Sequence, residues 1–135
     1  MTHVDHYAYD KPSVLLPRKG SIDRIYYVEK PFWNVDTIYY TMINEGVWPK
    51  YFYHYMTTVS MARYNKAGGV PSLTQGDWNR QFVPIPAFAV QKKVAAQLDA
   101  FAAVVAALDE EIAARREQFA GWLEKLMKFD AKEVA

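Results

Sequence analysis

The sequence contains no cysteine and few histidines, and these absences exclude several kinds of site. Without a thiol the chain can form no disulfide, no thiolate metal site and no cysteine nucleophile. The three histidines, His3, His6 and His54, are too few and too widely spaced to form a histidine metal site. We therefore predict no metal ion and no disulfide framework.

Long apolar runs and a strong charge of one sign are missing as well. No hydrophobic stretch approaches the length of about eighteen residues that a membrane span needs. Residues 1–10 lack the basic and then apolar pattern of a signal peptide, so we expect a cytoplasmic protein. The net charge is +1, which is no basic excess of the kind that would by itself indicate nucleic-acid binding.

Recognisable catalytic motifs are also missing. The chain has no glycine-rich phosphate loop, no G-x-S-x-G nucleophile elbow and no paired carboxylates in a known motif. We therefore predict a protein that is not an enzyme and that carries no cofactor.

The N-terminal part of the chain is rich in β-branched and aromatic residues. Residues 11–17 form a short apolar run, a turn signal follows at residues 18–21, and residues 22–29 have the composition of a second strand. This pattern predicts a hairpin whose turn displays two basic side chains. Residues 35–43 alternate along the chain and predict a third strand.

The segments that follow combine helix, loop and strand signals. Residues 51–64 have apolar side chains at helical spacing and are predicted to form a helix that ends before two glycines. Residues 70–80 predict a polar loop. Residues 82–86 predict a short strand, because the prolines on either side of Ile85 keep it extended.

The dominant feature is a predicted helix over residues 84–129 with an apolar heptad seam. Positions spaced alternately four and three residues apart are apolar at ten of eleven places. The seam consists of Val94, Leu98, Phe101, Val105, Leu108, Ile112, Arg115, Phe119, Trp122, Leu126 and Phe129. Such a helix would be on the order of 60 Å long, too long for the preceding residues to cover. Part of the seam must therefore meet another helix.

These patterns predict an α+β fold, with a small β-rich domain over residues 1–83 and a long coiled-coil-forming helix over residues 84–135. Arg115 is the polar member of the seam. It could set the register by pairing with Glu111 or with an acid of the opposing helix, or it could extend its charge out of a loosely packed interface.

A family resemblance appears where the β-rich part joins the helix. Residues 70–101 read VPSLTQGDWNRQFVPIPAFAVQKKVAAQLDAF. This passage resembles the end of a target-recognition domain in the specificity subunits of type I restriction-modification systems. Upstream, residues 12–41 resemble the strands and the arginine-containing turn of the same domains. The chain departs from the family pattern at Ala89-Val90-Gln91, where a Glu-Gln pair is usual. Since a complete recognition domain has several dozen more residues ahead of Met1, the chain resembles the later part of one such domain.

The resemblance implies a role in recognition without chemistry. In this family two recognition domains are held apart on antiparallel helices, and each reads one half of a split DNA target. Methyl transfer from S-adenosylmethionine belongs to a modification subunit, and cleavage belongs to a restriction subunit. For this chain the resemblance implies double-stranded DNA and a modification (methyltransferase) subunit as partners, with a restriction subunit as a further candidate. It also implies a homodimer paired through antiparallel helices.

Three polar groups are candidate DNA contacts under this resemblance. The first lies in and after the predicted hairpin turn, the second follows the predicted helix over residues 51–64, and the third lies in the polar loop. They are Arg18, Lys19, Ser21 and Arg24; Arg63 and Lys66; and Thr74, Gln75, Asn79 and Arg80. Arginine and lysine would contact phosphates or guanine, and glutamine and asparagine can pair with adenine.

Simpler explanations exist for each group. A turn is polar in any protein, cations are favoured at a helix C-terminus, and Trp78 fits a packing role at the domain edge. The many aromatic residues could stack on bases, but in a small domain core packing explains them better.

Three functions remain open. The first is a DNA-recognition half-subunit that dimerises and docks a methyltransferase. The second is an assembly and dimerisation module that does not read DNA, and the third is an unrelated coiled-coil scaffold. The family pattern favours the first.

Overall fold

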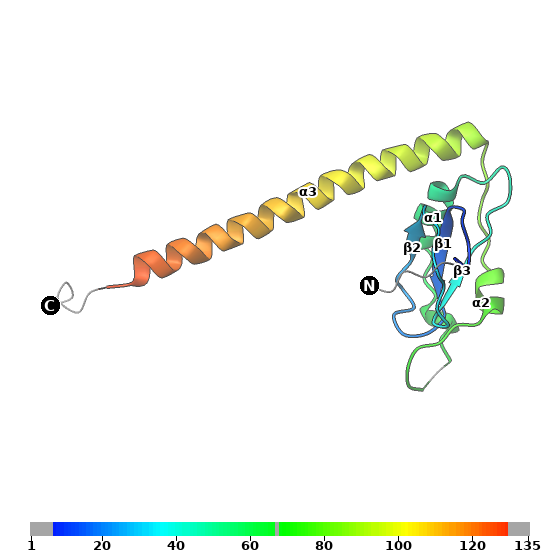
Figure 1. Ribbon diagram of the computed structural model, residues 1–135, viewed down its shortest axis with the longest axis horizontal. Coiled ribbons are helices and arrows are strands. Elements are labelled where there is room, and N and C mark those ends of the chain that lie inside the picture. The colour runs from blue at the N-terminus through cyan, green and yellow to red at the C-terminus, as the bar shows by residue number, and fades with distance from the viewer. Residues whose placement is uncertain (1–6, 67, 130–135) are drawn as a thin grey trace. The chain divides into compact units, whose positions relative to one another are not determined.

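The computed structural model describes residues 7–66 and 68–129. The elements, in chain order, are β1 (Ser13–Pro17), β2 (Tyr26–Val28), β3 (Ile38–Tyr40), α1 (Pro49–Thr57), a short 3-10 helix (Ala62–Tyr64), α2 (Gln75–Asn79) and α3 (Phe88–Met127) (Figure 1). The chain divides into two compact units, residues 1–96 and 97–135. The predicted α+β fold is confirmed, since a small antiparallel sheet is followed by a long helix.

β1 is the central strand of the sheet, which has the order β2-β1-β3. Both pairings are antiparallel, with Ser13 opposite Val28 and Pro17 opposite Ile38. The predicted hairpin of the first two strands is confirmed, and so is the third strand. β2 and β3 are both shorter than predicted.

At Thr41, the residue after β3, hydroxyl groups join the hydrogen-bond ladder beside a backbone bond from the Thr41 N–H to the Val14 carbonyl at 3.1 Å. The Val14 N–H donates to the Thr41 hydroxyl at 3.0 Å, and the Thr41 N–H donates to the Ser13 hydroxyl at 3.0 Å. The Ser13 hydroxyl donates to the Thr41 carbonyl at 2.8 Å. Side-chain hydrogen bonds of this kind compete with regular strand pairing.

The core of the small domain forms around β1, which is buried along most of its length. Its members come from β1, from α1, from the residue before the 3-10 helix, from the segment before α2 and from α2 itself: Val14, Leu16, Met56, Met61, Leu73 and Trp78. Partly buried tyrosines, isoleucines and valines, together with Phe52, pack against this cluster. The predicted packing role of Trp78 is confirmed, because its ring is buried and its indole N–H donates to the Pro17 carbonyl at 3.0 Å.

The predicted helix over residues 51–64 is wrong in its second half. α1 begins with Pro49, which suits the first position of a helix, and ends at Thr57. The hydroxyls of Thr57 and Thr58 donate to the carbonyls of His54 and Tyr55, both at 2.7 Å. Such bonds to backbone carbonyls weaken a helix and accompany its end here. The chain returns to helical geometry only in the short 3-10 helix.

The predicted loop over residues 70–80 contains a short helix. α2 is initiated by a capping box: the Asp77 N–H donates to the Thr74 hydroxyl at 3.2 Å, and the Thr74 N–H donates to the Asp77 carboxylate at 2.8 Å. The Thr-x-x-Asp spacing that makes this cap was present in the sequence. Polar composition alone therefore gave the wrong prediction.

The predicted strand over residues 82–86 is also wrong, since these residues pair with no strand. Tyrosines of α1 hold the segment instead. The Tyr55 hydroxyl donates to the Phe82 carbonyl at 3.1 Å, and the Tyr51 hydroxyl donates to the Pro84 carbonyl at 2.9 Å. The helix begins at Phe88, later than the predicted start, which agrees with the bias of residues before a proline away from helical geometry.

Gln91, in the first turns of α3, is fully buried and makes three hydrogen bonds to the backbone. Its side-chain oxygen accepts from the Trp48 N–H at 2.8 Å. Its side-chain nitrogen donates to the carbonyls of Gly46 and Pro86, at 2.9 and 2.8 Å. One side chain therefore joins the start of α3 to the loop before α1 and to the segment before the helix.

α3 is 40 residues long and continues without a break through Gly121. From residue 100 onward, every described side chain is exposed. None of the helices within the described residues has the length and hydrophobicity needed to span a bilayer.

We predict that Gln91→Ala destabilises the small domain. The substitution leaves the Trp48 N–H and two carbonyls without their partner, and each unsatisfied buried group costs about 1–3 kcal/mol. Because these three hydrogen bonds are only partly buried, we expect a total loss near the low end of that sum, about 3–4 kcal/mol, measured by urea unfolding. Gln97→Ala removes an exposed glutamine from the same helix and should cost less than about 0.5 kcal/mol. Equal losses for the two variants would contradict the role of Gln91.

Candidate nucleic-acid interface

Three residues of the first candidate group lie together beside the end of β1. They line a hollow of about 140 Å³ whose rim carries two cationic side chains. The lining consists of Pro17, Lys19, Ser21, Arg24, Tyr26, Thr37 and Ile38. We call this the basic hollow. Its lysine, serine and arginine are exposed, so their cationic and hydroxyl groups are available to a phosphate.

The backbone around Gly20 builds the basic hollow. Gly20 has φ of 88°, a conformation that is strained for any side chain, and its N–H donates to the Pro71 carbonyl at 2.9 Å. The Arg24 N–H donates to the Ser21 carbonyl at 3.2 Å and closes a turn. The turn is thus attached to the segment that leads into α2.

Arg18 is directed into the fold. Its guanidinium donates to the Asp36 carbonyl at 3.0 Å and lies 5.9 Å from the centre of the Tyr39 ring. Its backbone N–H donates to the Thr37 carbonyl at 2.9 Å, and its carbonyl accepts from the Leu73 N–H at 2.8 Å. Arg18 therefore connects the end of β1 to two other segments and does not line the basic hollow.

Arg63 and Arg80 line a second hollow, of about 560 Å³, which we call the arginine hollow. Its other lining residues are Tyr55, Thr58, Val59, Ser60, Gln81 and Phe82. The Arg63 guanidinium lies 4.9 Å from the centre of the Tyr64 ring and donates to the Tyr64 hydroxyl at 3.1 Å. Arg80 is 3.4 Å from the Asp77 carboxylate. Lys66 is exposed and is not part of the lining.

The protonation equilibrium of Tyr64 reflects the charge of this region. A hydrogen bond with the Gln81 side chain lowers the pKa of Tyr64 below its usual value of 10.0. The guanidinium groups of Arg63 and Arg80 lower the pKa further, whereas burial opposes the shift.

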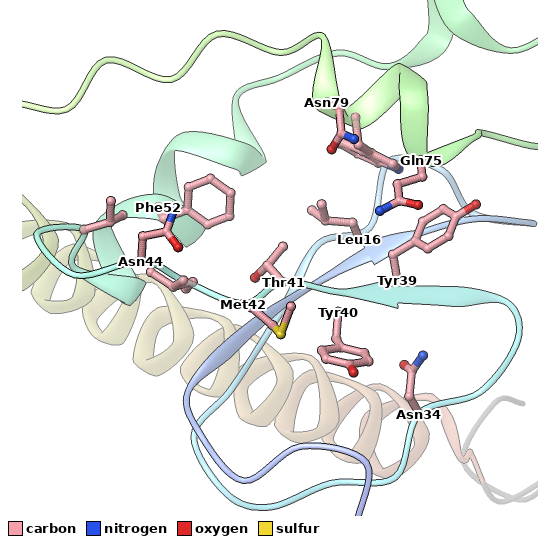
Figure 2. A pocket seen from close by; sticks show the side chains of 13 residues that line it. Leu16, Asn34, Tyr39, Tyr40, Thr41, Met42, Asn44, Phe52, Gln75 and Asn79 are labelled. Atoms are coloured by element: carbon pink, nitrogen blue, oxygen red, sulfur yellow. The ribbon is translucent and has the colours of Figure 1, made fainter.

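Gln75 and Asn79 face a third hollow, of about 560 Å³, between α2 and the β3 side of the sheet. Figure 2 shows both amides extending from α2 toward Leu16 and Tyr39, with Asn34 and Tyr40 further along the same hollow. We call this the amide hollow. Asn34 is already engaged, because its side chain donates to the Ile38 carbonyl at 2.9 Å. The exposed amides on α2 have the donor and acceptor pair that adenine recognition requires.

Thr74 serves the start of α2. Its hydroxyl donates to the Asp77 carboxylate at 2.6 Å and accepts from the Asp77 N–H. The hydrogen bonds from the side chain and the backbone of Thr74 lower the pKa of Asp77 below its usual value of 3.8. Because the folded pKa is depressed, the ionised cap stabilises the fold at neutral pH. This contribution is lost as the pH falls through the folded pKa.

The seam on α3 is exposed over most of its length. Leu108 is 53% exposed and Phe119 is 67% exposed, whereas Val94 at the start of the seam is half-buried. A groove of about 380 Å³ is lined by Leu108, Glu111, Ile112, Arg115, Arg116 and Phe119. Arg115 lies 3.5 Å from Glu111 of the same helix, one of the alternatives left open by the sequence, and it also donates to the Gln118 side chain at 3.2 Å.

Several residues of these surfaces were not among the sequence candidates. Tyr26, Gln81 and Tyr39 line the three hollows. Tyr26 and Gln81 are close in sequence to the candidates Arg24 and Arg80, whereas Tyr39 reaches the amide hollow from a segment far from α2 in the chain. Gln91 did have a signal, because a glutamine follows the Pro-Ile-Pro run in the family pattern. Within the described residues, no group of three or more potential ligands is placed to hold a metal ion.

Comparison with known families identifies the class of protein. A family model described as the type I restriction modification DNA specificity domain matches residues 1–115. Comparison with curated proteins and with solved structures finds no match. Because the family match covers most of the chain, this chain belongs to the type I restriction-modification specificity family. The resemblance drawn from residues 12–41 and 70–101 is confirmed, while the individual DNA contacts stay predictions.

Proposed function

We propose that the chain is a DNA-recognition half-subunit of a type I restriction-modification system, which dimerises through α3 and docks a methyltransferase subunit. The observation that carries this proposal is the exposed apolar seam of α3 in a chain that belongs to a DNA-specificity family. Water-exposed leucine, phenylalanine and tryptophan at heptad spacing are stabilised when a second helix covers them. We place the recognition part in residues 1–83 and the dimerisation helix in residues 84–135.

In this proposal the three hollows have different roles on DNA. Lys19 and Arg24 in the basic hollow, and Arg63 and Arg80 in the arginine hollow, would contact phosphates and set the position of the domain. Gln75 and Asn79 would read base edges from the amide hollow. Lys66 and Ser21 are further phosphate contacts in this scheme. Arg18 would support the turn, and Thr74 would support α2.

A homodimer determines the form of the DNA target. Two identical recognition parts related by a two-fold axis would read two identical half-sites in opposite orientation, so the target would be a palindrome with an unspecified spacer. Methyl transfer and cleavage would be carried out by partner subunits. Lys92 and Lys93, exposed in the first turns of α3, are candidate contacts for the methyltransferase subunit.

One observation favours a second function, an assembly and dimerisation module that does not read DNA. The guanidinium groups of Arg18, Arg63 and Arg80 already have partners within the domain. Their use on phosphate would require these contacts to be shared or exchanged. Lys19 and Arg24 have no such partner among the described residues, so they give the sharper test of DNA binding.

We predict that Lys19→Ala combined with Arg24→Ala weakens duplex binding and reduces its salt dependence. Each lost phosphate contact should reduce the magnitude of the slope of log affinity against log salt by about 1, so we expect the double variant to reduce this magnitude by about 2. The slope is measured by fluorescence anisotropy on a mixed-sequence duplex between low and moderate salt.

Lys11→Ala combined with Lys30→Ala is the matched control. It removes the same charge from exposed lysines at the opposite end of the β1–β2 hairpin, where Ser13 pairs with Val28. The control should keep the parent slope. If both double variants lower the slope equally, the basic hollow is not a specific contact, and if the parent itself shows no salt-dependent binding, the assembly module is the better account.

We predict that Leu108→Asp, at the middle of the seam, dissociates the dimer. Burying an unpaired carboxylate in the interface should raise the dimer Kd by more than ~100-fold, as measured by sedimentation equilibrium. Ala103→Asp introduces the same charge on the side of the helix away from the seam and should leave the Kd nearly unchanged. A Leu108→Asp variant that sediments like the parent would contradict the seam as the interface.

A further inference from the structure

The charged residues that flank the seam distinguish one pairing of α3 from all others. We propose that α3 pairs with α3 of a second copy of this chain, antiparallel, with the two-fold axis passing between Ala113 and Ala114. The inference rests on the proposed dimerisation and on the antiparallel direction that the family resemblance implies, and it adds to them the register of the two helices.

The apolar layers fit this register over the length of the exposed seam. With the axis at this position Ile112 lies opposite the partner's Arg115, and Leu108 lies opposite the partner's Phe119. The next layers outward match Val105 with the partner's Trp122, and Phe101 with the partner's Leu126. Every seam residue from Phe101 to Leu126 thereby meets a seam residue within the partner's α3, and each of these apolar side chains is exposed in the single chain. In each apolar layer a larger side chain lies opposite a smaller one, as interdigitating seams require.

Opposite charges meet on both flanks of the seam in this register. On one flank Asp109 lies about 3 Å along the helix axis from the partner's Arg116, given the rise of 1.5 Å per residue. Within the described residues neither Asp109 nor Arg116 has an ion-pair partner of its own. On the other flank Glu111 lies about 1.5 Å along the helix axis from the partner's Arg115, given the same rise per residue. The two-fold axis repeats each pair, so four ion pairs surround the centre.

The polar seam residue is thereby accounted for. Arg115 lies beside the axis. It keeps its contact with Glu111 of its own chain at 3.5 Å, and it gains a second contact, with the partner's Glu111. The groove lined by Leu108, Ile112 and Phe119 and rimmed by Glu111 and Arg116 lies at this centre. A surface at a two-fold axis must be complementary to itself, and this groove combines an apolar floor with one acid, Glu111, and two arginines, Arg115 and Arg116.

Sliding the helices by one heptad loses this match in either direction. One shift places the axis at Glu110, where Asp109 meets the partner's Asp109 and Glu111 meets the partner's Glu111. The other shift places the axis at Glu117, where Arg116 approaches the partner's Arg116. This second shift gains a Glu111 contact with the partner's Lys125, but it leaves Phe101 with no seam residue opposite. Like charges at flanking positions oppose pairing.

A parallel arrangement is also disfavoured. A parallel pair in register would keep an ion pair between Glu111 and the partner's Arg116. However, it would also place Arg115 and the partner's Arg115 in one layer of the seam. Two guanidinium groups side by side in an apolar layer repel one another and lose hydration.

A scan of single cysteines tests the register, and the absence of native cysteine makes every thiol unambiguous. Four variants are treated with a short bis-maleimide cross-linker and run under denaturing conditions: Leu108→Cys, Ile112→Cys, Arg115→Cys and Phe119→Cys. In an antiparallel pair, the equivalent residues of the two chains lie within cross-linking distance only near the two-fold axis. We expect dimer bands for positions 112 and 115 and none for positions 108 and 119.

The other outcomes overturn the inference in distinguishable ways. Cross-links at 108 and 112, or at 115 and 119, would show a heptad-shifted pair, and cross-links at all four positions would show a parallel pair. In these cases the proposed dimerisation stands and only the register fails. No cross-link at any position, with a parent chain that sediments as a monomer, overturns the dimerisation too, and binding of that monomer to a modification subunit would assign the seam to that partner.

Charge exchange provides a second readout that does not disturb the apolar layers. Asp109→Arg alone and Arg116→Asp alone should each weaken the dimer Kd by roughly 5- to 10-fold, because each replaces an attraction with a repulsion in two symmetric places. The combined variant restores opposite charges and should recover the parent Kd within about 2-fold. Additive losses in the combined variant would overturn the Asp109–Arg116 pairing.

Discussion

The buried amide of Gln91 is the interaction on which the rest of the chain depends. Its three hydrogen bonds connect the first turns of α3 to the loop before α1 and to the Pro-Ile-Pro segment. A glutamine is suited to this position because its side chain accepts and donates at once, and the site presents one N–H and two carbonyls. The first turns of α3 are therefore anchored to the small domain by polar contacts.

The seam on α3 and the polar hollows of the small domain differ in the kind of partner that stabilises them. The seam exposes large apolar side chains that are stabilised by contact with another helix. The hollows instead present cations and amides whose partners are hydrogen-bonding and anionic groups. We propose that the hollows contact DNA and that the seam serves assembly.

Sequence periodicity was sufficient to predict the long helix, because its seam follows from the spacing of apolar residues. Strand composition and a turn signal were sufficient to predict the central hairpin. These signals failed where single side chains decide the local structure. The hydroxyls of Thr57 and Thr58 accompany the end of α1, and the Thr74–Asp77 capping box starts α2 inside a predicted loop. Tyrosine hydroxyls of α1 hold residues 82–86 in place of a strand partner.

The candidate contacts were predicted by residue type, and the fold sorts them by position. Lys19, Ser21 and Arg24 converge on one hollow, whereas Arg18, their neighbour in sequence, is directed into the fold by the Asp36 carbonyl and the Tyr39 ring. Nothing local distinguishes Arg18 from Lys19, because the difference is made by a segment almost twenty residues away. Residues that line a hollow from several segments cannot be found before the fold is known.

The central claim is that this chain reads DNA as a symmetric dimer. Selection from a random-sequence duplex library, with the chain alone and with a modification subunit, tests this claim most directly. The account predicts enrichment of a palindrome whose two half-sites are separated by an unspecified spacer of fixed length. If the chain forms a dimer and enriches no sequence under either condition, it is an assembly module, and the claim of DNA reading is contradicted.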